Sequence, residues 1–135
     1  MSAAAKLKVS SIVLDASALL ACLNSEPGSE SIIDELPDSL VSTVNLAEAV
    51  SVLVRQGASK EKACEVLSLL EFQVVDFDRA SAEETGALAG LTRSAGLSLG
   101  DRACLALAAR ENLPAVTADR AWSGVNVGVQ IRFIR

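Results

Sequence analysis

The chain has 135 residues, half of them hydrophobic and 21% charged, so it can bury a core and is too apolar for a disordered protein. Its net charge of −5 and aromatic content of 3% disfavour nucleic-acid binding through a basic patch or by base stacking. No apolar run approaches the roughly 18 residues of a membrane span, and Asp15 interrupts the only signal-like segment. We therefore expect a cytoplasmic protein without a membrane segment, with one domain over residues 1–135.

Strands and helices are predicted to alternate along the chain. The predicted strands cover residues 8–14, 40–43, 72–77, 115–117 and 125–133. The predicted helices cover residues 16–23, 29–36, 44–56, a segment capped by Ser59, a long segment at 78–95, and 98–110. We expect Pro37 to stop the second helix, and the alternating residues of the last strand to lie at a sheet edge. This order predicts an α/β fold with a mainly parallel central sheet flanked by helices.

The cysteines are an odd number without the spacing of a metal site. Cys22, Cys64 and Cys104 each lie among apolar residues at helical spacing. We interpret all three as buried free thiols in a reducing compartment.

Two carboxylates follow predicted strands directly. Asp15 comes after the first strand, and Asp119 follows the strand at residues 115–117 almost as closely. In open parallel sheets ligands bind beyond the carboxyl ends of the strands, so these two acids could converge on one crevice. Each is equally well explained alone as a helix N-cap, as we expect for Asp78.

Two further acids lie on otherwise apolar helices. Glu48 is the sole charge in NLAEAVSVLV, and Asp101 lies one turn into SLGDRACLALAA. Neither has a basic residue three or four positions away, and a desolvated carboxylate needs a partner. The alternatives are an ion pair of Glu48 with Arg102 or Arg120, and a capping box of Ser98 with Asp101.

A bound divalent cation would also satisfy these acids. The chain has no His, and its cysteines are scattered, so a zinc site is not expected. An all-oxygen set of carboxylates suits Mg²⁺ or Mn²⁺.

Three segments resemble the PIN-domain family, and especially its VapC-type toxins. They are VLDASALLACLNSEPG, STVNLAEAVSVL and GLSLGDRACLALAARENLPAVTADRAW, and the resemblance runs from about Ile12 to Trp122. It implies a PIN-like three-layer sandwich. The family's four acids fall on Asp15, Glu48, Asp101 and Asp119, and its accompanying hydroxyls fall on Ser17 and Thr117.

The resemblance implies a metal-dependent endoribonuclease in which these four acids are catalytic, metal-binding residues. Cleavage would use a water activated on Mg²⁺ or Mn²⁺ and leave 5′-phosphate and 3′-hydroxyl ends. Arg102 and Arg120 each follow a site acid and are candidates for phosphate contact, or alternatively for neutralising the acids or capping helices.

The implied partners are an RNA substrate, a cognate antitoxin with a basic segment, and a second copy of the chain in a homodimer. Apolar residues around Leu19, Leu20 and 50–54 could supply an interface or belong to the core. A housekeeping PIN nuclease and a non-catalytic PIN-like scaffold that binds RNA or protein remain alternatives.

Two unrelated families with acidic pockets fit less well. A receiver-type phospho-acceptor domain needs paired acids after the first strand and a Lys after the last, which SSIVLD and the region around Gln130 lack. A haloacid-dehalogenase-like phosphatase needs Asp-x-Asp, whereas this chain has Asp15-Ala16-Ser17.

Overall fold

A five-stranded sheet forms the centre of the computed structural model, which describes residues 9–135. Its strand order is β3-β2-β1-β4-β5, and every neighbouring pair is parallel. The strands are β1 (Ile12–Leu14), β2 (Ser39–Ser42), β3 (Gln73–Val75), β4 (Ala115–Thr117) and β5 (Ile131–Phe133). The expected parallel sheet is thus confirmed, and β5 lies at its edge as predicted.

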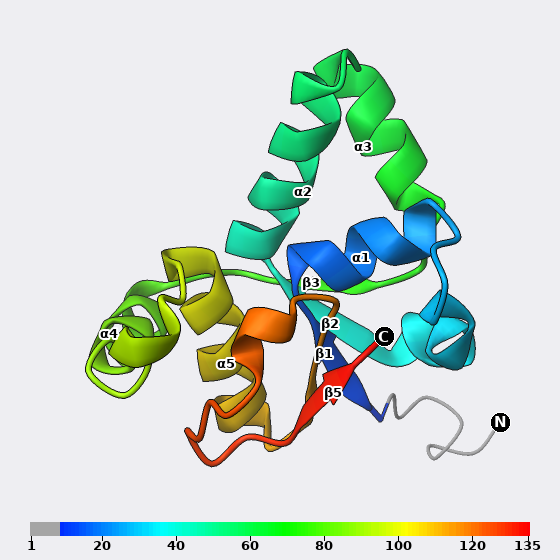
Figure 1. Cartoon of the computed structure of the whole chain (residues 1–135). Helices are drawn as coiled ribbons and strands as arrows, with labels where there is room; N and C mark the ends of the chain where they lie inside the picture. The colour runs from blue at the N-terminus through cyan, green and yellow to red at the C-terminus, as the bar shows by residue number, and fades with distance from the viewer. Residues whose placement is uncertain (1–8) are drawn as a thin grey trace, which may run out of the picture.

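Helices cover both faces of this sheet (Figure 1). The α-helices are α1 (Ala16–Leu23), α2 (Thr43–Arg55), α3 (Lys60–Ser68), α4 (Arg79–Ala87) and α5 (Leu99–Glu111). Short 3₁₀ segments are η2 (Ser29–Ser31), η3 (Ile33–Asp38), η4 (Arg93–Ala95) and η5 (Arg120–Trp122).

Strand β1 shows why the fold has three layers. Ile12 and Leu14 pack with α1, α2 and α3, whereas Val13 packs with α5 on the opposite face. Side chains alternate between the faces of a strand, so an uninterrupted apolar run needs cover on both sides. All three residues are fully buried, and the expected three-layer sandwich is confirmed.

The predicted long helix over residues 78–95 is wrong. Asp78 caps α4 as expected, but the α-helix ends at Ala87 and the chain continues through turns to η4. Gly86 and Gly90 weaken helix formation here, because glycine loses the most backbone entropy on folding. Gly96 ends the segment in the left-handed conformation, with φ +65°.

Two other predicted elements are shorter or different. The last strand was predicted from residue 125 but pairs only over β5, because β4 offers three residues and Gly128 turns the chain with φ +79°. The expected helix over residues 29–36 is replaced by η2 and η3, and Pro37 lies inside η3 instead of stopping a helix. Of the first predicted strand, residue 8 lies outside the described part of the chain, and β1 begins at Ile12.

One of the three cysteines predicted to be buried is exposed. Cys22 and Cys104 are buried free thiols as predicted, but Cys64 is exposed. On α3 the core-facing positions are Ala63 and Leu67, and Cys64 is rotated about 100° from Ala63.

Among the described residues, no helix is long and apolar enough to cross a membrane.

Candidate active site

The carboxyl ends of β1 and β4 lie side by side, and each is followed by an acid. The two strands pair in parallel through Leu14 and Val116, so Asp15 and Asp119 emerge at the same edge of the sheet. Both acids also act as N-caps. Asp15 accepts from the backbone N–H of Ala18 at the start of α1, and Asp119 accepts from Ala121 at the start of η5. The cap interpretation is therefore right for both, and it is compatible with a site at this edge.

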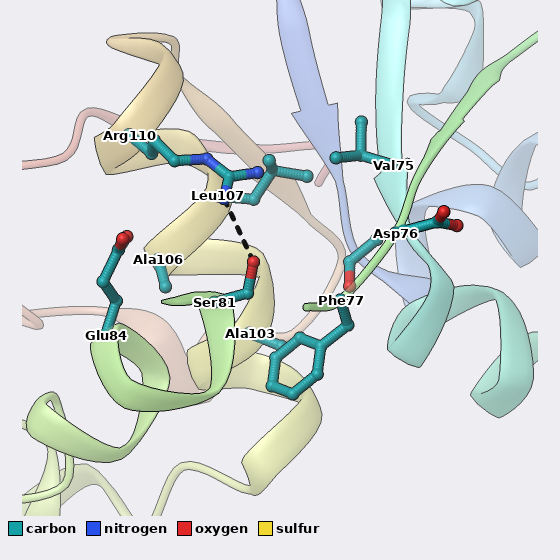
Figure 2. A pocket seen from close by; sticks show the side chains of 10 residues that line it. Val75, Asp76, Phe77, Ser81, Glu84, Ala103, Ala106, Leu107 and Arg110 are labelled. Carbon is teal, nitrogen blue, oxygen red and sulfur yellow. Dashed lines mark hydrogen bonds between the residues drawn. The ribbon is translucent and has the colours of Figure 1, made fainter. Parts of the chain in front are cut away.

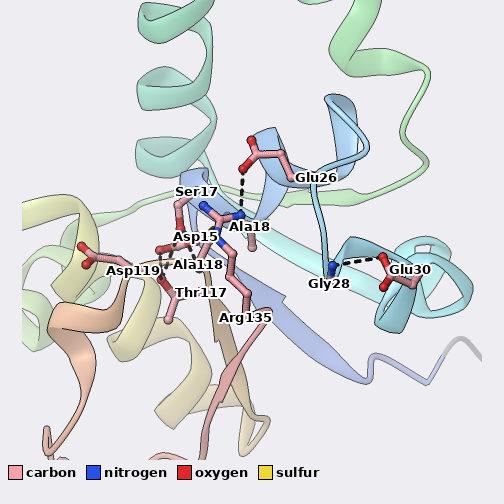
Figure 3. Close-up of polar contacts among 10 residues, drawn as sticks. All are labelled: Asp15, Ser17, Ala18, Glu26, Gly28, Glu30, Thr117, Ala118, Asp119 and Arg135. Carbon is pink, nitrogen blue, oxygen red and sulfur yellow. Dashed lines mark hydrogen bonds and ion pairs between the residues drawn. The ribbon is translucent and has the colours of Figure 1, made fainter.

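A network of hydroxyl groups holds the Asp15 carboxylate, which is only 3% exposed. Ser17 Oγ donates to Oδ1 over 2.8 Å, and Thr117 Oγ1 donates to Oδ2 over 2.6 Å (Figure 3). Thr117 Oγ1 in turn accepts from the backbone N–H of Asp119, and Ser17 Oγ accepts from that of Ala118. The two hydroxyls thus tie Asp15 to the segment that carries Asp119.

The pKa of Asp15 is raised from 3.8 to about 6. Burial is the main cause and the charge of Asp101 adds to it, while hydrogen bonds from Thr117, Ala18 and Ser17 lower the pKa in part. Within residues 9–135 this buried carboxylate has no ion-pair partner, and a bound cation would stabilise its charged form. Figure 3 also shows the ion pair of Arg135 with Glu26, in which Arg135 Nη1 lies 2.7 Å from Glu26 Oε1.

Glu48 enters the site from helix α2. Its Oε1 accepts a 2.9 Å hydrogen bond from Asn45 Nδ2, which also donates to the backbone oxygen of Gly100 at 3.0 Å. A Cβ at position 100 would take the space of the Glu48 carboxyl group, so any larger residue there would force that carboxyl group to move. Burial raises the pKa of Glu48, Asn45 lowers it, and Asp101 raises it.

Asp101 lies in the first turn of α5, directly after Gly100. It forms the capping box that the sequence suggested: Ser98 N–H donates to Asp101 Oδ2 at 3.0 Å, and Asp101 N–H donates to Ser98 Oγ at 3.2 Å. The box fixes the start of α5 and leaves Asp101 half-buried.

The four acids line one open cleft of about 400 Å³. The other side chains around it include Ser17, Leu20, Ser51, Val52 and Arg55. Strand ends therefore contribute Asp15 and Asp119, while helices α2 and α5 contribute Glu48 and Asp101. The catalytic and metal-binding roles of these residues stay predictions.

The two predicted phosphate contacts have protein partners. Arg102 Nη1 donates to the backbone oxygen of Thr85, and Arg120 Nη1 donates to that of Arg135. The Arg120 guanidinium also lies 4.4 Å from the centre of the Phe133 ring. Neither arginine forms an ion pair with Glu48 in the described part of the chain, so that alternative is wrong.

Sequence reasoning missed Asn45 and Arg55. Both lie on α2 on the same face as Glu48, at positions i−3 and i+7 from it. This spacing is the signal that would have found them. Arg55 lines the cleft, and among residues 9–135 it makes no side-chain hydrogen bond or ion pair.

A second cavity, between α4 and α5, has a different character (Figure 2). It measures about 10 Å³, and Arg110 Nη1 donates to Ser81 Oγ across it. That volume suits about one water molecule. The acidic cleft is therefore the better candidate for substrate binding.

The acidic cleft fits a divalent cation in its chemistry. Its donors are carboxylate and hydroxyl oxygens, the ligands that Mg²⁺ and Mn²⁺ prefer. Within residues 9–135, no three acidic, cysteine or histidine side chains are close enough to form a complete ion site by themselves. Mg²⁺ commonly binds through only one or two carboxylates and keeps several waters, so such a cluster is not required.

A family model of the PIN domain matches residues 12–127. The chain belongs to the PIN domain family. Its fold is similar to that of the DNA-bound VapBC from Salmonella typhimurium, with a TM-score of 0.75 and 18% identity, covering 94% of this chain and 100% of that chain. The fold is also similar to that of VapC20 from Mycobacterium tuberculosis, a toxin that cleaves the sarcin–ricin loop. The TM-score is 0.71 and the identity 16%, covering 86% of this chain and 97% of that chain.

A third structure with a similar fold is FitAcB from Neisseria gonorrhoeae, with a TM-score of 0.67 and 17% identity over 91% of this chain and 97% of that chain. At such identities the likeness concerns the fold. The sequence matches no curated protein.

Proposed function

We propose that this PIN-domain protein is a metal-dependent endoribonuclease, and that it is the toxin of a type II toxin–antitoxin pair. The observation that carries the proposal is the convergence of Asp15, Glu48, Asp101 and Asp119 on one cleft at the carboxyl ends of β1 and β4. Family membership supports nuclease chemistry, and the VapC-like fold of the solved neighbours supports the toxin.

The hydrogen bonds of Asp15 determine where it would bind a cation. A carboxylate has about four acceptor positions, two on each oxygen. Oδ1 uses both, for Ser17 and Ala18, whereas Oδ2 accepts only from Thr117 among the described residues. Asp15 would therefore bind Mg²⁺ or Mn²⁺ through Oδ2, with Ser17 and Thr117 holding the carboxylate in place.

Glu48, Asp101 and Asp119 would complete the site from three other elements. A bound divalent cation would lower the pKa of the attacking water and neutralise charge on the phosphate in the transition state. The four carboxylates would then act as ligands and water-orienting groups. A cation would also offset the burial, and the smaller repulsion from Asp101, that raise the pKa of Asp15 and Glu48.

Arg55 is a candidate for contact with an RNA phosphate. It lines the cleft two turns along α2 from Glu48, and the described part of the chain gives it no competing partner. Arg102 and Arg120 would first have to exchange their bonds to Thr85 and Arg135. We therefore propose Arg55 ahead of those two, because phosphate contacts position the substrate without reading its sequence.

A cognate antitoxin is the proposed regulatory partner. Similar structures include VapBC from Salmonella typhimurium and a toxin–antitoxin complex from Klebsiella pneumoniae. Four acids in one cleft would attract a basic side chain of such a partner. Of the proposed interface residues, Leu19 and Leu53 are core, Leu20 and Val50 are half-buried, and Val54 is 45% exposed. The homodimer stays a prediction.

The test is cleavage of RNA by the purified chain without antitoxin, in Mg²⁺, Mn²⁺ or EDTA, with mapping of the product ends. We expect metal-dependent internal cleavage that leaves 5′-phosphates and is lost in Asp15→Asn. A Gly86→Ala variant is the matched control, since position 86 has open space around it and lies on α4 away from the cleft.

A folded protein that binds varied RNAs without cleaving them in either metal would contradict the nuclease. The non-catalytic PIN-like scaffold would then replace it.

A further inference from the structure

Asn45 is a fully buried polar side chain that connects two helices of the cleft. It lies in the first turns of α2, three residues before Glu48, and is 0% exposed. Its Nδ2 donates to Glu48 Oε1 at 2.9 Å and to the backbone oxygen of Gly100 at 3.0 Å. Both partners are acceptors, so the amide must point its NH₂ group at them.

The other atom of this amide shows that the bridge has a cost. Asn45 Oδ1 is buried and has no hydrogen-bond partner within the described residues. An unpaired buried carbonyl oxygen loses its hydration without compensation. An apolar residue of the same shape, such as leucine, would fill this position without that loss. The two N–H groups are therefore the feature for which asparagine is needed here.

The bridge joins two of the site's acids. Gly100 directly precedes Asp101, and its missing Cβ makes room for the Glu48 carboxyl group. Asn45 holds that same carboxyl group and the Gly100 carbonyl with one planar amide. The relative position of Glu48 and the first turn of α5 therefore depends on Asn45.

We propose that Asn45 is a positioning residue that fixes Glu48 against the start of α5, so that Glu48 and Asp101 face one divalent cation. This inference rests on the proposed function, because it assumes that the cleft binds a cation. Asn45 acts through Glu48 and does not itself bind the ion, since its NH₂ group is committed to two protein oxygens.

The test compares Mn²⁺ affinity by calorimetry in the wild type, Asn45→Leu, Glu48→Gln and the double variant. Leucine keeps the branched shape and removes both donors. We expect Asn45→Leu to weaken Mn²⁺ binding about 10- to 100-fold, the usual effect of losing a group that orients a metal ligand. In the Glu48→Gln background the same substitution should have almost no further effect on Mn²⁺ affinity, because Asn45 is proposed to act only through the Glu48 carboxylate.

The control is Thr85→Val, which removes a buried hydroxyl that has no hydrogen-bond partner within residues 9–135. Thr85 lies on α4, outside the cleft. The substitution should leave Mn²⁺ affinity unchanged. If Asn45→Leu does not fold, as judged by circular dichroism, Asn45→Ser is used. It can donate one hydrogen bond instead of two and should still weaken Mn²⁺ binding.

Three outcomes separate the two proposals. If the wild type binds Mn²⁺ and the folded Asn45 variants bind it equally tightly, the positioning role is overturned while the proposed function stands. If Asn45→Leu weakens Mn²⁺ binding equally in the wild-type and Glu48→Gln backgrounds, the positioning role is also overturned. If the folded wild type itself binds no Mn²⁺, the proposed function fails, and the positioning role fails with it.

Discussion

The cleft has two halves that are built differently. In the strand half, Asp15 is nearly inaccessible and receives three hydrogen bonds, two of them from hydroxyls that also bind the segment before Asp119. In the helix half, Glu48 is half-buried, and it is held by one amide from its own helix. The strand half is fixed by sheet pairing, whereas the helix half depends on how closely α2 and α5 approach.

The strand half of the cleft is therefore the more rigid one, and the helix half is the one that can adjust its side chains. The buried half carries an electrostatic cost, because burial raises the pKa of Asp15 to about 6. The helix half can adjust, because the Glu48 and Asp101 side chains are only half-buried. We expect the strand half to anchor a cation and the helix half to complete its coordination.

The largest effect should come from Asp15→Asn, which removes the anchor while preserving the shape of the side chain. We expect RNA cleavage in Mn²⁺ to fall by roughly 100-fold or more, beyond the usual effect of losing a group that supports a ligand. Single-turnover cleavage rates measure it. If Glu48→Gln lowers the cleavage rate far more than Asp15→Asn does, the strand half is not the anchor of the cation.

The cost of burying Asp15 should appear in the pH dependence of stability without metal. Between pH 3.8 and about 6, the folded carboxyl holds a proton that the unfolded one has lost. The free energy of unfolding should therefore fall as pH rises through this window. A tenfold change in proton affinity is worth about 1.4 kcal/mol, so the fall could reach about 3 kcal/mol.

Urea unfolding in EDTA from pH 4 to 7.5 measures this effect as the difference between wild type and Asp15→Asn, which lacks the titrating group. A difference that does not change with pH would show that Asp15 ionises in the folded protein as it does in the unfolded chain.

Gly100→Ala tests the helix half, because the new methyl group would occupy the space of the Glu48 carboxyl group. We expect a clear loss of Mn²⁺ affinity as Glu48 is displaced, with little loss of stability, because only the end of a flexible, half-buried side chain has to move. Gly86→Ala is the matched control: it should stabilise α4 by about 0.5–1 kcal/mol, since alanine loses less backbone entropy there. Equal effects of the two substitutions would mean that Glu48 moves without consequence.

The smallest of the four effects is expected for Thr117→Val. It removes the donor to Asp15 Oδ2 and the acceptor of the Asp119 N–H, while the shape is retained. We expect a loss of about 1.5 kcal/mol, the lower range for a hydrogen bond to a charged group, because Ser17 still holds Oδ1. The pKa of Asp15 should rise further, which carbon-detected NMR titration would reveal; a lowered pKa would contradict the network.

The strand half was accessible from the sequence because its signals are local. Asp15 directly follows an apolar run, and the caps formed by Asp15 and Asp119 need only a few neighbouring residues. The parallel sheet also followed from the alternation of elements. The short β5 did not, because its length depends on what β4 can pair with.

The helix half was less accessible because it rests on contacts between distant segments. Asn45 reads as one polar residue on an apolar helix, and its role appears only when Gly100, 55 residues later, lies beside it. The exposure of Cys64 likewise depends on which side of α3 meets the core. Arg55 was within reach, since its i+7 spacing from Glu48 is a local pattern.

The most direct test of the central claim is a crystal of the protein grown in Mn²⁺, with anomalous data collected at the manganese edge. The proposal predicts a peak in the acidic cleft about 2 Å from Asp15 Oδ2. Glu48 or Asp101 should bind the same ion, either directly or through a coordinated water. A cleft without an anomalous peak at saturating Mn²⁺, or a peak that leaves Asp15 uncoordinated, would contradict it.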